Sequence, residues 1–234
     1  MIASAVSPEQ LRQRLSVVRA RIEAAGRDPD SVTVVGVTKG FDVSAVHAAR
    51  AVGLSDLGES YAQEMVTKTD AAGPDVRWHW VGRLQRNKVR QIASHVALWH
   101  SVDRAELGAE IARRAPGAEV LVQINPVGDV AKGGCSPDET PGLVADLRAE
   151  GLVVGGLMVV APQQPAAAAA CFRAVRRLAD DLDLRERSMG MSDDLEAAVA
   201  EGATMVRVGT ALFGERDPSR GTGDRQAGPA KRDG

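Results

Sequence analysis

The sequence predicts an α/β protein built as a single (β/α)8 barrel with one extra helix before the first strand. Eight short runs of apolar and β-branched residues alternate with helical patterns over about 180 residues, which is the element count of that barrel. Most runs are apolar throughout, as expected for parallel strands that are buried on both faces. The strict alternation excludes most α+β folds, and a doubly wound open sheet is the alternative.

The extra helix is the first element of the chain. Ser7 to Gln10 form a capping box with proline at the first helical position, apolar residues follow from Leu11 to Ile22 at helical spacing, and Gly26 closes the helix. The strands follow in order. We predict them at 33–39, 54–59, 77–82, 97–102, 119–125, 152–160, 184–189, which is the weakest pattern, and 203–209.

A helix is predicted between each pair of strands. Their signals are a capping residue or proline at the start and apolar residues three or four positions apart. We predict these helices after Asp42, near Ser60, through Val89 and Ile92, at Leu107 and Ile111, after a second capping box at 136–139, from Pro165, and at Leu195 and Val199.

Composition bounds the possible functions of the 234-residue chain. A net charge of −2 and a pI near 6.1 argue against a general binder of nucleic acid or of membrane surfaces. Cys135 and Cys171 give neither a disulfide framework nor metal-ligand spacing, and no apolar run is long enough to span a membrane. We expect a cytoplasmic protein with a barrel domain at 1–217. The Gly-, Pro-, Asp- and Arg-rich segment 218–234 is predicted to be a disordered tail.

Lys39 lies at the carboxyl end of the first predicted strand, where barrel enzymes place their sites. The chain has only five lysines against twenty-four arginines, so a lysine at this position favours a specific role over incidental surface charge. Unlike arginine, a lysine becomes a neutral amine nucleophile in dry or electropositive surroundings. Lys39 is therefore a candidate for an imine to a carbonyl cofactor, with a solvated loop lysine as the alternative.

The last two strands end in loops suited to an anion. In a closed barrel the eighth strand lies beside the first, so Arg207 and Gly209 face Lys39. Loops 188–194 and 207–210 offer small residues at helix starts, where backbone N–H groups favour a phosphate. Pyridoxal 5'-phosphate (PLP) would use the amine, the phosphate seat and the fixed cation. We predict that the cofactor is bound by Lys39, Ser188, Ser192, Arg207, Gly209 and Thr210.

Arg207 beside the ring nitrogen of PLP cannot accept a proton, so it would leave the pyridine unprotonated and weaken the ring as an electron sink. Each of these residues also has an ordinary interpretation. Ser192 is also a plausible helix cap, and Arg207 could pair with a carboxylate. His79 is interpreted as a core histidine. The basic residues Arg83, Arg86, Lys88 and Arg90 are interpreted as a solvated helix face.

Several segments resemble the pyridoxal phosphate homeostasis proteins (the YggS or PROSC family), which look like the barrel domain of alanine racemase standing alone. The resemblance implies Lys39 as the Schiff-base lysine, Ser192, Gly209 and Thr210 at the phosphate, and Arg207 near the ring nitrogen. It runs from about residue 30 to 217 in the family's order. The matching segments are 37–39, 57–64, 78–88, 122–125, 132–134, 156–158, 188–194 and 206–214.

Three departures from the family's pattern involve four positions. Gly40 and Phe41 stand where the family usually has a second lysine and a proline, which puts in doubt any transfer role of that lysine. Ser60 replaces the usual asparagine, and Asp129 replaces the usual glutamate.

Two functions compete. The first is a carrier that binds PLP reversibly, keeps it available in the cell and passes it to PLP-dependent apo-enzymes. The second is a fold-type III enzyme such as an amino-acid racemase, which needs an acid or base on each face of the substrate carbon. Lys39 supplies only one, so we expect a binding protein, and a lone barrel leans monomeric. A barrel enzyme without cofactor would need paired carboxylates at the strand ends, where only Glu59 is placed.

Overall fold

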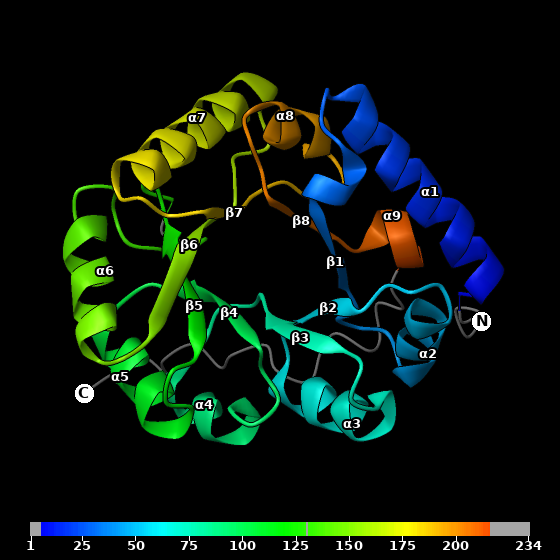
Figure 1. Cartoon of the computed structure of the whole chain (residues 1–234), viewed down its shortest axis with the longest axis horizontal. Coiled ribbons are helices and arrows are strands. Elements are labelled where there is room, and N and C mark those ends of the chain that lie inside the picture. Colours follow the sequence, from blue (N-terminus) through cyan, green and yellow to red (C-terminus); the bar gives the residue numbers. More distant parts are fainter. Residues whose placement is uncertain (1–5, 130, 216–234) are drawn as a thin grey trace, which may run out of the picture.

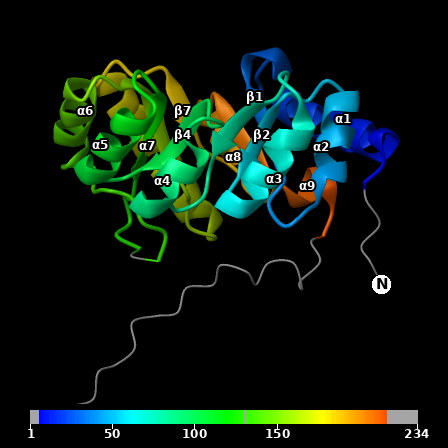
Figure 2. The same cartoon turned by 90° about the horizontal axis from the view of Figure 1, so that it is seen from below.

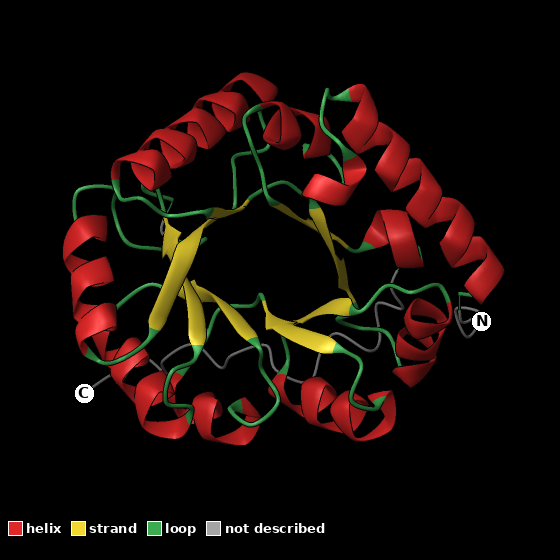
Figure 3. Ribbon diagram, in the orientation of Figure 1, coloured by secondary structure: helices red, strands yellow, loops and turns green. Residues whose placement is uncertain are grey.

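Eight parallel strands close into a barrel in chain order, and helices surround it on the outside (Figures 1 and 3). This computed structural model describes residues 6–129 and 131–215. The predicted (β/α)8 barrel is confirmed, and the doubly wound sheet is excluded because the first and last strands pair. The strands are β1 (Thr33–Val37), β2 (Asp56–Glu59), β3 (Arg77–Trp80), β4 (Leu98–Val102), β5 (Glu119–Ile124), β6 (Val153–Val159), β7 (Glu186–Ser188) and β8 (Met205–Val208).

The pairing of β1 with β8 closes the barrel and sets the register of the site. Val35 lies opposite Arg207, and Gly36 lies opposite Val208. The residues that follow β1 and β8 therefore emerge side by side at the carboxyl mouth. The prediction that the ends of the first and last strands are neighbours is confirmed.

Helices cover the barrel on all sides, and Figure 2 shows α3 and α4 in front of the strands. The extra N-terminal helix α1 packs against α8 and α9. Its predicted capping box is formed by reciprocal bonds between Ser7 and Gln10, of 3.1 and 3.2 Å. The helices are α1 (Pro8–Ala24), α2 (Val43–Ala51), α3 (Ala62–Ala72), α4 (Arg86–Ile92), α5 (Ala105–Arg114), α6 (Thr140–Ala149), α7 (Pro165–Asp181), α8 (Leu195–Ala200) and α9 (Thr210–Phe213), with a short 3-10 turn at Pro29–Ser31.

Most differences from the predicted elements lie at their boundaries. The weak seventh strand exists but is only three residues long. The second capping box forms between Ser136 and Glu139, yet α6 begins only after it, at Thr140. Helix α9 was not predicted, because four residues are too few to show a helical period.

The core has two parts. The larger lies between the outer face of the strands and the helices. Inside the barrel, the side chains of Leu98, Leu121, Met158 and Met205 pack together. Two residues further along β4 and β8, the interior positions are polar, His100 and Arg207. The interior therefore changes from apolar to polar toward the mouth that carries the site.

Two further predictions concern membrane-spanning segments and the C-terminal tail. In residues 6–129 and 131–215, no helix is both long and apolar enough to cross a membrane. The predicted tail at 218–234 lies outside the described residues, so the boundary at 217 stays a prediction.

Candidate functional site

Lys39 lies in a tight turn immediately after β1. The N–H of Phe41 donates to the carbonyl of Thr38 at 3.0 Å, which closes the turn. Gly40 has a φ of +78°, in the left-handed region that glycine adopts without strain. Phe41 packs against Phe213 of α9, with ring centroids 5.6 Å apart. The Gly40–Phe41 pair that departs from the family pattern is therefore matched to this backbone geometry.

A buried ionic cluster holds the turn from behind. Lys68 of α3 donates to the carbonyl of Thr38 at 2.8 Å, contacts Glu59 at the end of β2, and pairs with Glu64 at 2.8 Å. The hydroxyl of Thr38 donates to Glu59 at 2.9 Å, and the N–H of Gly40 donates to Glu64 at 2.8 Å. Bonds on both sides of Lys39 thus fix its backbone.

The electrostatics of this cluster reflect its burial. Burial raises the pKa of the Glu59 carboxyl, and the ammonium of Lys68 offsets part of that effect. The sequence shows Glu64 and Lys68 only as a pair four residues apart on a helix, which is typical of a solvated surface. Lys68 was therefore not identified from the sequence as the buried partner of Glu59. Because Glu59 is fully buried and paired with Lys68, it is not available as a catalytic carboxylate.

A cavity of about 430 Å³ at the carboxyl mouth brings most of the predicted site residues together. We call it the Ser192 cavity. Its floor and wall include apolar side chains such as Val37 and Met191. The predicted residues that line it are Lys39, Ser192, Arg207, Gly209 and Thr210.

Ser192 is held by two segments that are distant in sequence. Its hydroxyl accepts the N–H of Ala211 in α9 at 3.4 Å. Its carbonyl accepts from Arg21 of α1 at 2.8 Å, and Arg21 also pairs with Glu196 at 2.6 Å. The Arg21 guanidinium holds the pKa of the Glu196 carboxyl below its usual value. The extra N-terminal helix therefore fixes the loop that carries Ser192.

Arg207 is almost fully buried and makes three hydrogen bonds. It donates to the carbonyl and to the hydroxyl of Ser188, both at 2.7 Å, and to the carbonyl of Val159 at 2.8 Å. Burial lowers its pKa to about 10, so the guanidinium stays charged near neutral pH. These acceptors are uncharged, so no carboxylate neutralises Arg207 by direct contact within the described part of the chain.

Ser188 is the one predicted cofactor residue that does not line the Ser192 cavity. It was expected among the residues that bind the cofactor, but its side chain is fully buried in β7 and does not line the Ser192 cavity. Its hydroxyl lies 2.7 Å from Arg207 and 2.9 Å from Nδ1 of His100. Ser188 therefore supports Arg207 from inside the barrel.

The polar chain continues from Ser188 across the barrel. His100 Nε2 lies 2.8 Å from His79 Nδ1, and His79 Nε2 lies 2.9 Å from a carboxylate oxygen of Asp56, at the start of β2. Both imidazoles are fully buried, which confirms that His79 is a core histidine. Burial, with the neighbouring His79 and Arg207, holds the pKa of His100 well below its usual value.

One assignment of tautomers gives this chain a single direction. The Asp56 carboxylate accepts from Nε2 of His79, whose Nδ1 then accepts from His100. His100 then accepts from the hydroxyl of Ser188, which in turn accepts from Arg207. Each side chain satisfies the next, so Arg207 is linked to Asp56 by an unbroken line of hydrogen bonds.

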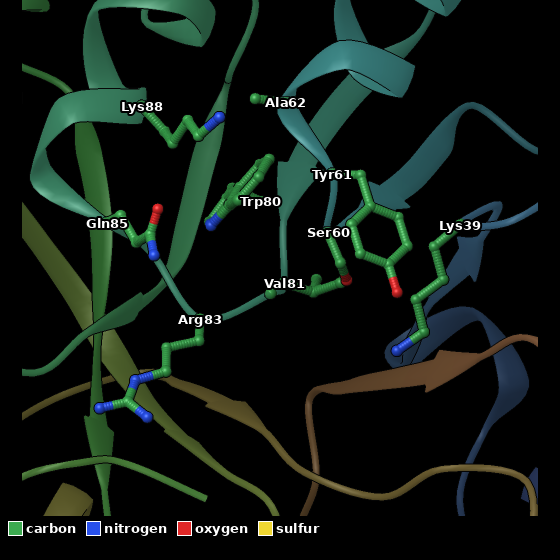
Figure 4. A pocket seen from close by; sticks show the side chains of 10 residues that line it. Lys39, Ser60, Tyr61, Ala62, Trp80, Val81, Arg83, Gln85 and Lys88 are labelled. Carbon is green, nitrogen blue, oxygen red and sulfur yellow. The ribbon is translucent and has the colours of Figure 1, made fainter. Parts of the chain in front are cut away.

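A second cavity, of about 350 Å³, lies on the other side of Lys39 (Figure 4). We call it the Trp80 cavity. Arg83 and Lys88 line it. Arg83 is exposed to solvent and Lys88 is partly exposed, but Arg83 precedes α4, so it is not part of the helix face on which it was predicted. Arg86 and Arg90 are exposed, as that interpretation expected. Lining residues with polar or aromatic side chains are Lys39, Ser60, Tyr61, Trp80, Arg83, Gln85 and Lys88.

Other reactive side chains do not form a centre. Within residues 6–129 and 131–215, no group of three His, Cys, Asp or Glu residues is arranged to bind a metal ion. Cys135 and Cys171 are both buried, and burial raises the pKa of the Cys171 thiol to about 11. These thiols are therefore poor nucleophiles in the folded protein.

Comparisons with known proteins agree with this geometry. The family described as "Alanine racemase, N-terminal domain" matches residues 6–217. A protein named pyridoxal phosphate homeostasis protein from Pseudomonas aeruginosa is 41% identical over 220 residues, which cover 89% of this chain and 95% of that protein. A protein of the same name from Aquifex aeolicus is 37% identical over 222 residues, covering 89% and 97%.

A solved structure shows the same fold with a ligand. PipY of Synechococcus elongatus, with PLP bound, superposes with a TM-score of 0.78 at 33% sequence identity. The match covers 87% of this chain and the whole of that one.

Proposed function

The chain belongs to the alanine racemase N-terminal domain family and to its pyridoxal phosphate homeostasis proteins, and we propose that it binds PLP covalently through Lys39 and acts in PLP homeostasis. The observation that carries the proposal is the Ser192 cavity. There an amine, a buried guanidinium and two hydroxyl side chains line one space of about 430 Å³. The structure of PipY with PLP bound supports the same ligand class.

The missing side chain at Gly209 bears on whether the cavity can hold a phosphate ester. A Cβ placed on Gly209 would meet only ordinary contacts, the nearest being the carbonyl of Val37 at 3.5 Å, and its φ of −108° suits any residue. The barrel itself therefore does not require glycine here. Gly209 lines the cavity, so the missing side chain leaves room for a ligand against the backbone. The residues present fit the group.

Bound PLP supplies an aldehyde for an amine and a ring that can withdraw electrons. In the proposed site Lys39 provides the amine, while the bonds around its turn limit where that amine can lie. Ser192 and Thr210 offer hydroxyls to the phosphate beside Gly209. Arg207 can only donate, so a ring nitrogen next to it receives a hydrogen bond without gaining a proton, and electron withdrawal stays weak.

The alternative is an amino-acid racemase, and the lining of the cavity favours binding without turnover. Racemisation requires a positioned acid or base on each face of the reacting carbon. Besides Lys39 and Arg207, the titratable side chain lining the Ser192 cavity is Asp193, which is exposed to solvent. An exposed carboxylate is not held in one orientation toward the reacting carbon, so it makes a poor second base.

We further propose that the protein works in the cytoplasm as a monomer and passes PLP to apo-enzymes. The closed barrel supports the monomer, because it leaves no unpaired strand edge for a second copy. The name shared by the relatives, with its reference to homeostasis, supports the supply role.

The experiment that tests this function pairs a binding assay with a turnover assay. Equilibrium dialysis of PLP should give one tight site that is strongly weakened by Lys39→Ala and by Arg207→Gln but not by Arg86→Gln, an exposed arginine outside the cavity. When L-alanine is added to the PLP-loaded protein, the circular dichroism signal of L-alanine should stay constant. A steady loss of that signal, absent in Lys39→Ala, would instead establish the racemase.

A further inference from the structure

We propose that the Trp80 cavity is a second oxyanion site, which takes the carboxylate or phosphate of another small molecule beside Lys39. This site is separate from the Ser192 cavity: Lys39 and Val81 line both, but none of the phosphate-loop residues lines the Trp80 cavity. The proposal does not require PLP to be bound, because Ser60, Trp80, Arg83 and Lys88 line the Trp80 cavity alone.

Buried donors without partners point to a missing acceptor. The Trp80 side chain is buried, with 2% of its surface exposed, and its indole N–H makes no hydrogen bond; the buried hydroxyl of Ser60 also lacks a partner. An indole N–H can only donate, so the missing partner is an acceptor. Leaving such a group unpaired destabilises a fold, because its hydration is lost and not replaced. Both residues line this cavity.

The charge of the lining decides between water and an anion. Either could accept from Trp80 and Ser60, but three of the described residues that line this cavity are cationic, Lys39, Arg83 and Lys88, and none of the described lining residues carries a carboxylate. Cationic side chains around a partly enclosed space favour a negatively charged oxygen over neutral water. Arg83, whose guanidinium suits the planar geometry of carboxylates and phosphates, forms no ion pair with another residue of 6–129 or 131–215.

The backbone brings these groups together by close packing. A Cβ on Gly82 would lie 2.6 Å from Cβ and 2.7 Å from Cα of Ser60, so only glycine lets the end of β3 approach the end of β2. Figure 4 shows the amine end of Lys39 and the hydroxyl end of Tyr61 pointing to the same side of the cavity. An oxyanion held here would be a neighbour of whatever Lys39 binds.

The indole N–H signals of the tryptophans test the site directly. Apoprotein labelled with ¹⁵N is titrated with inorganic phosphate and, separately, with acetate. We expect the Trp80 indole signal to shift and saturate with at least one of them. Trp99 is the internal control, because its indole N–H is also buried and unpartnered but does not line the cavity. Its signal should stay in place.

Two variants test whether anion binding near Trp80 depends on Arg83. Arg83→Gln should weaken the binding seen at Trp80 by about tenfold or more, whereas Arg86→Gln, an exposed arginine outside the cavity, should leave it unchanged. A shift with phosphate alone or with acetate alone identifies the preferred oxyanion. The inference is overturned if neither anion moves the Trp80 signal, or if Arg83→Gln binds as the wild type does. Phosphate in the Ser192 cavity would not reproduce the Arg83 dependence, so this test is independent of the PLP proposal.

Discussion

Arg207 donates two hydrogen bonds to Ser188, one to the carbonyl and one to the hydroxyl, each 2.7 Å long. The only cation predicted beside the cofactor ring is therefore oriented by a residue that does not line the cavity. Behind Ser188, His100 and His79 extend the support to Asp56. This arrangement explains how a buried, charged guanidinium keeps one position without a carboxylate partner.

Ser188→Ala should loosen Arg207 while leaving the fold intact. The change removes the hydroxyl that joins Arg207 to His100, so the free energy of unfolding should fall by about 1–3 kcal/mol and PLP affinity should fall with it. Denaturant unfolding and PLP dialysis measure the two effects. Thr140→Val is the matched control, since it removes another buried hydroxyl, which donates to the carbonyl of Ser136, far from the site. If both variants keep full affinity, the support role of Ser188 is refuted.

Lys68→Met should be among the most destabilising changes to a polar residue. It leaves Glu59 buried without its cation, and breaking a buried ion pair in this way costs about 3–5 kcal/mol. Adding Glu59→Gln removes the stranded charge and should restore part of the loss in denaturant unfolding. PLP affinity should fall in Lys68→Met because the Lys39 turn loses its bond at Thr38. A double variant less stable than Lys68→Met would contradict the account.

Gly209→Ala separates ligand binding from folding. The new methyl group meets no close protein contact, so thermal stability should stay near that of the wild type while PLP affinity drops several-fold. Gly82→Ala should instead lower the thermal stability, because its methyl group would clash with the backbone of Ser60. Melting curves and dialysis of the two proteins provide the comparison. Unchanged PLP affinity in Gly209→Ala would remove Gly209 from the site.

Arg21→Gln should reveal a pH-dependent link between α1 and the Ser192 loop. Because Arg21 holds the pKa of Glu196 below its unfolded value of 4.5, the stability from this pair is present above pH 4.5 and is lost as pH falls through the folded pKa. Both side chains are partly exposed, so the effect should be modest, about 0.2–1 kcal/mol at pH 7. Unfolding of wild type and variant at pH 7 and near pH 3 should show the larger difference at pH 7, because the bond from Arg21 to the Ser192 carbonyl does not depend on Glu196. Equal differences at the two pH values would contradict the link.

The sequence was sufficient to predict the barrel and most of the site because both depend on local patterns. A β-branched run followed by Lys39 marks a strand end, and the closure of an eight-stranded barrel then places Arg207 and Gly209 next to it. The roles of Ser188 and Lys68 depend on which long-range partner each side chain meets. Lys68 looked like a surface residue because its buried partner, Glu59, belongs to a different element.

The Trp80 cavity shows the same limit. Arg83 and Lys88 lie in a basic segment that is usually solvated, and only the packing of Gly82 against Ser60 reveals that they border a cavity with buried donors. Which side chains border this cavity depends on how the ends of β2 and β3 pack together. The spacing of residues within one segment does not show that packing.

The absorbance spectrum of the purified protein with PLP, recorded beside Lys39→Ala and Lys132→Ala, tests the central claim most directly. Lys132 is the control because its ammonium donates to the carbonyl of Ala161 and does not line the Ser192 cavity. The account predicts a band at about 400 nm in the wild type and in Lys132→Ala, absent in Lys39→Ala, with borohydride fixing the ligand to Lys39. The same band in Lys39→Ala, or a trapped adduct on another lysine, would contradict it.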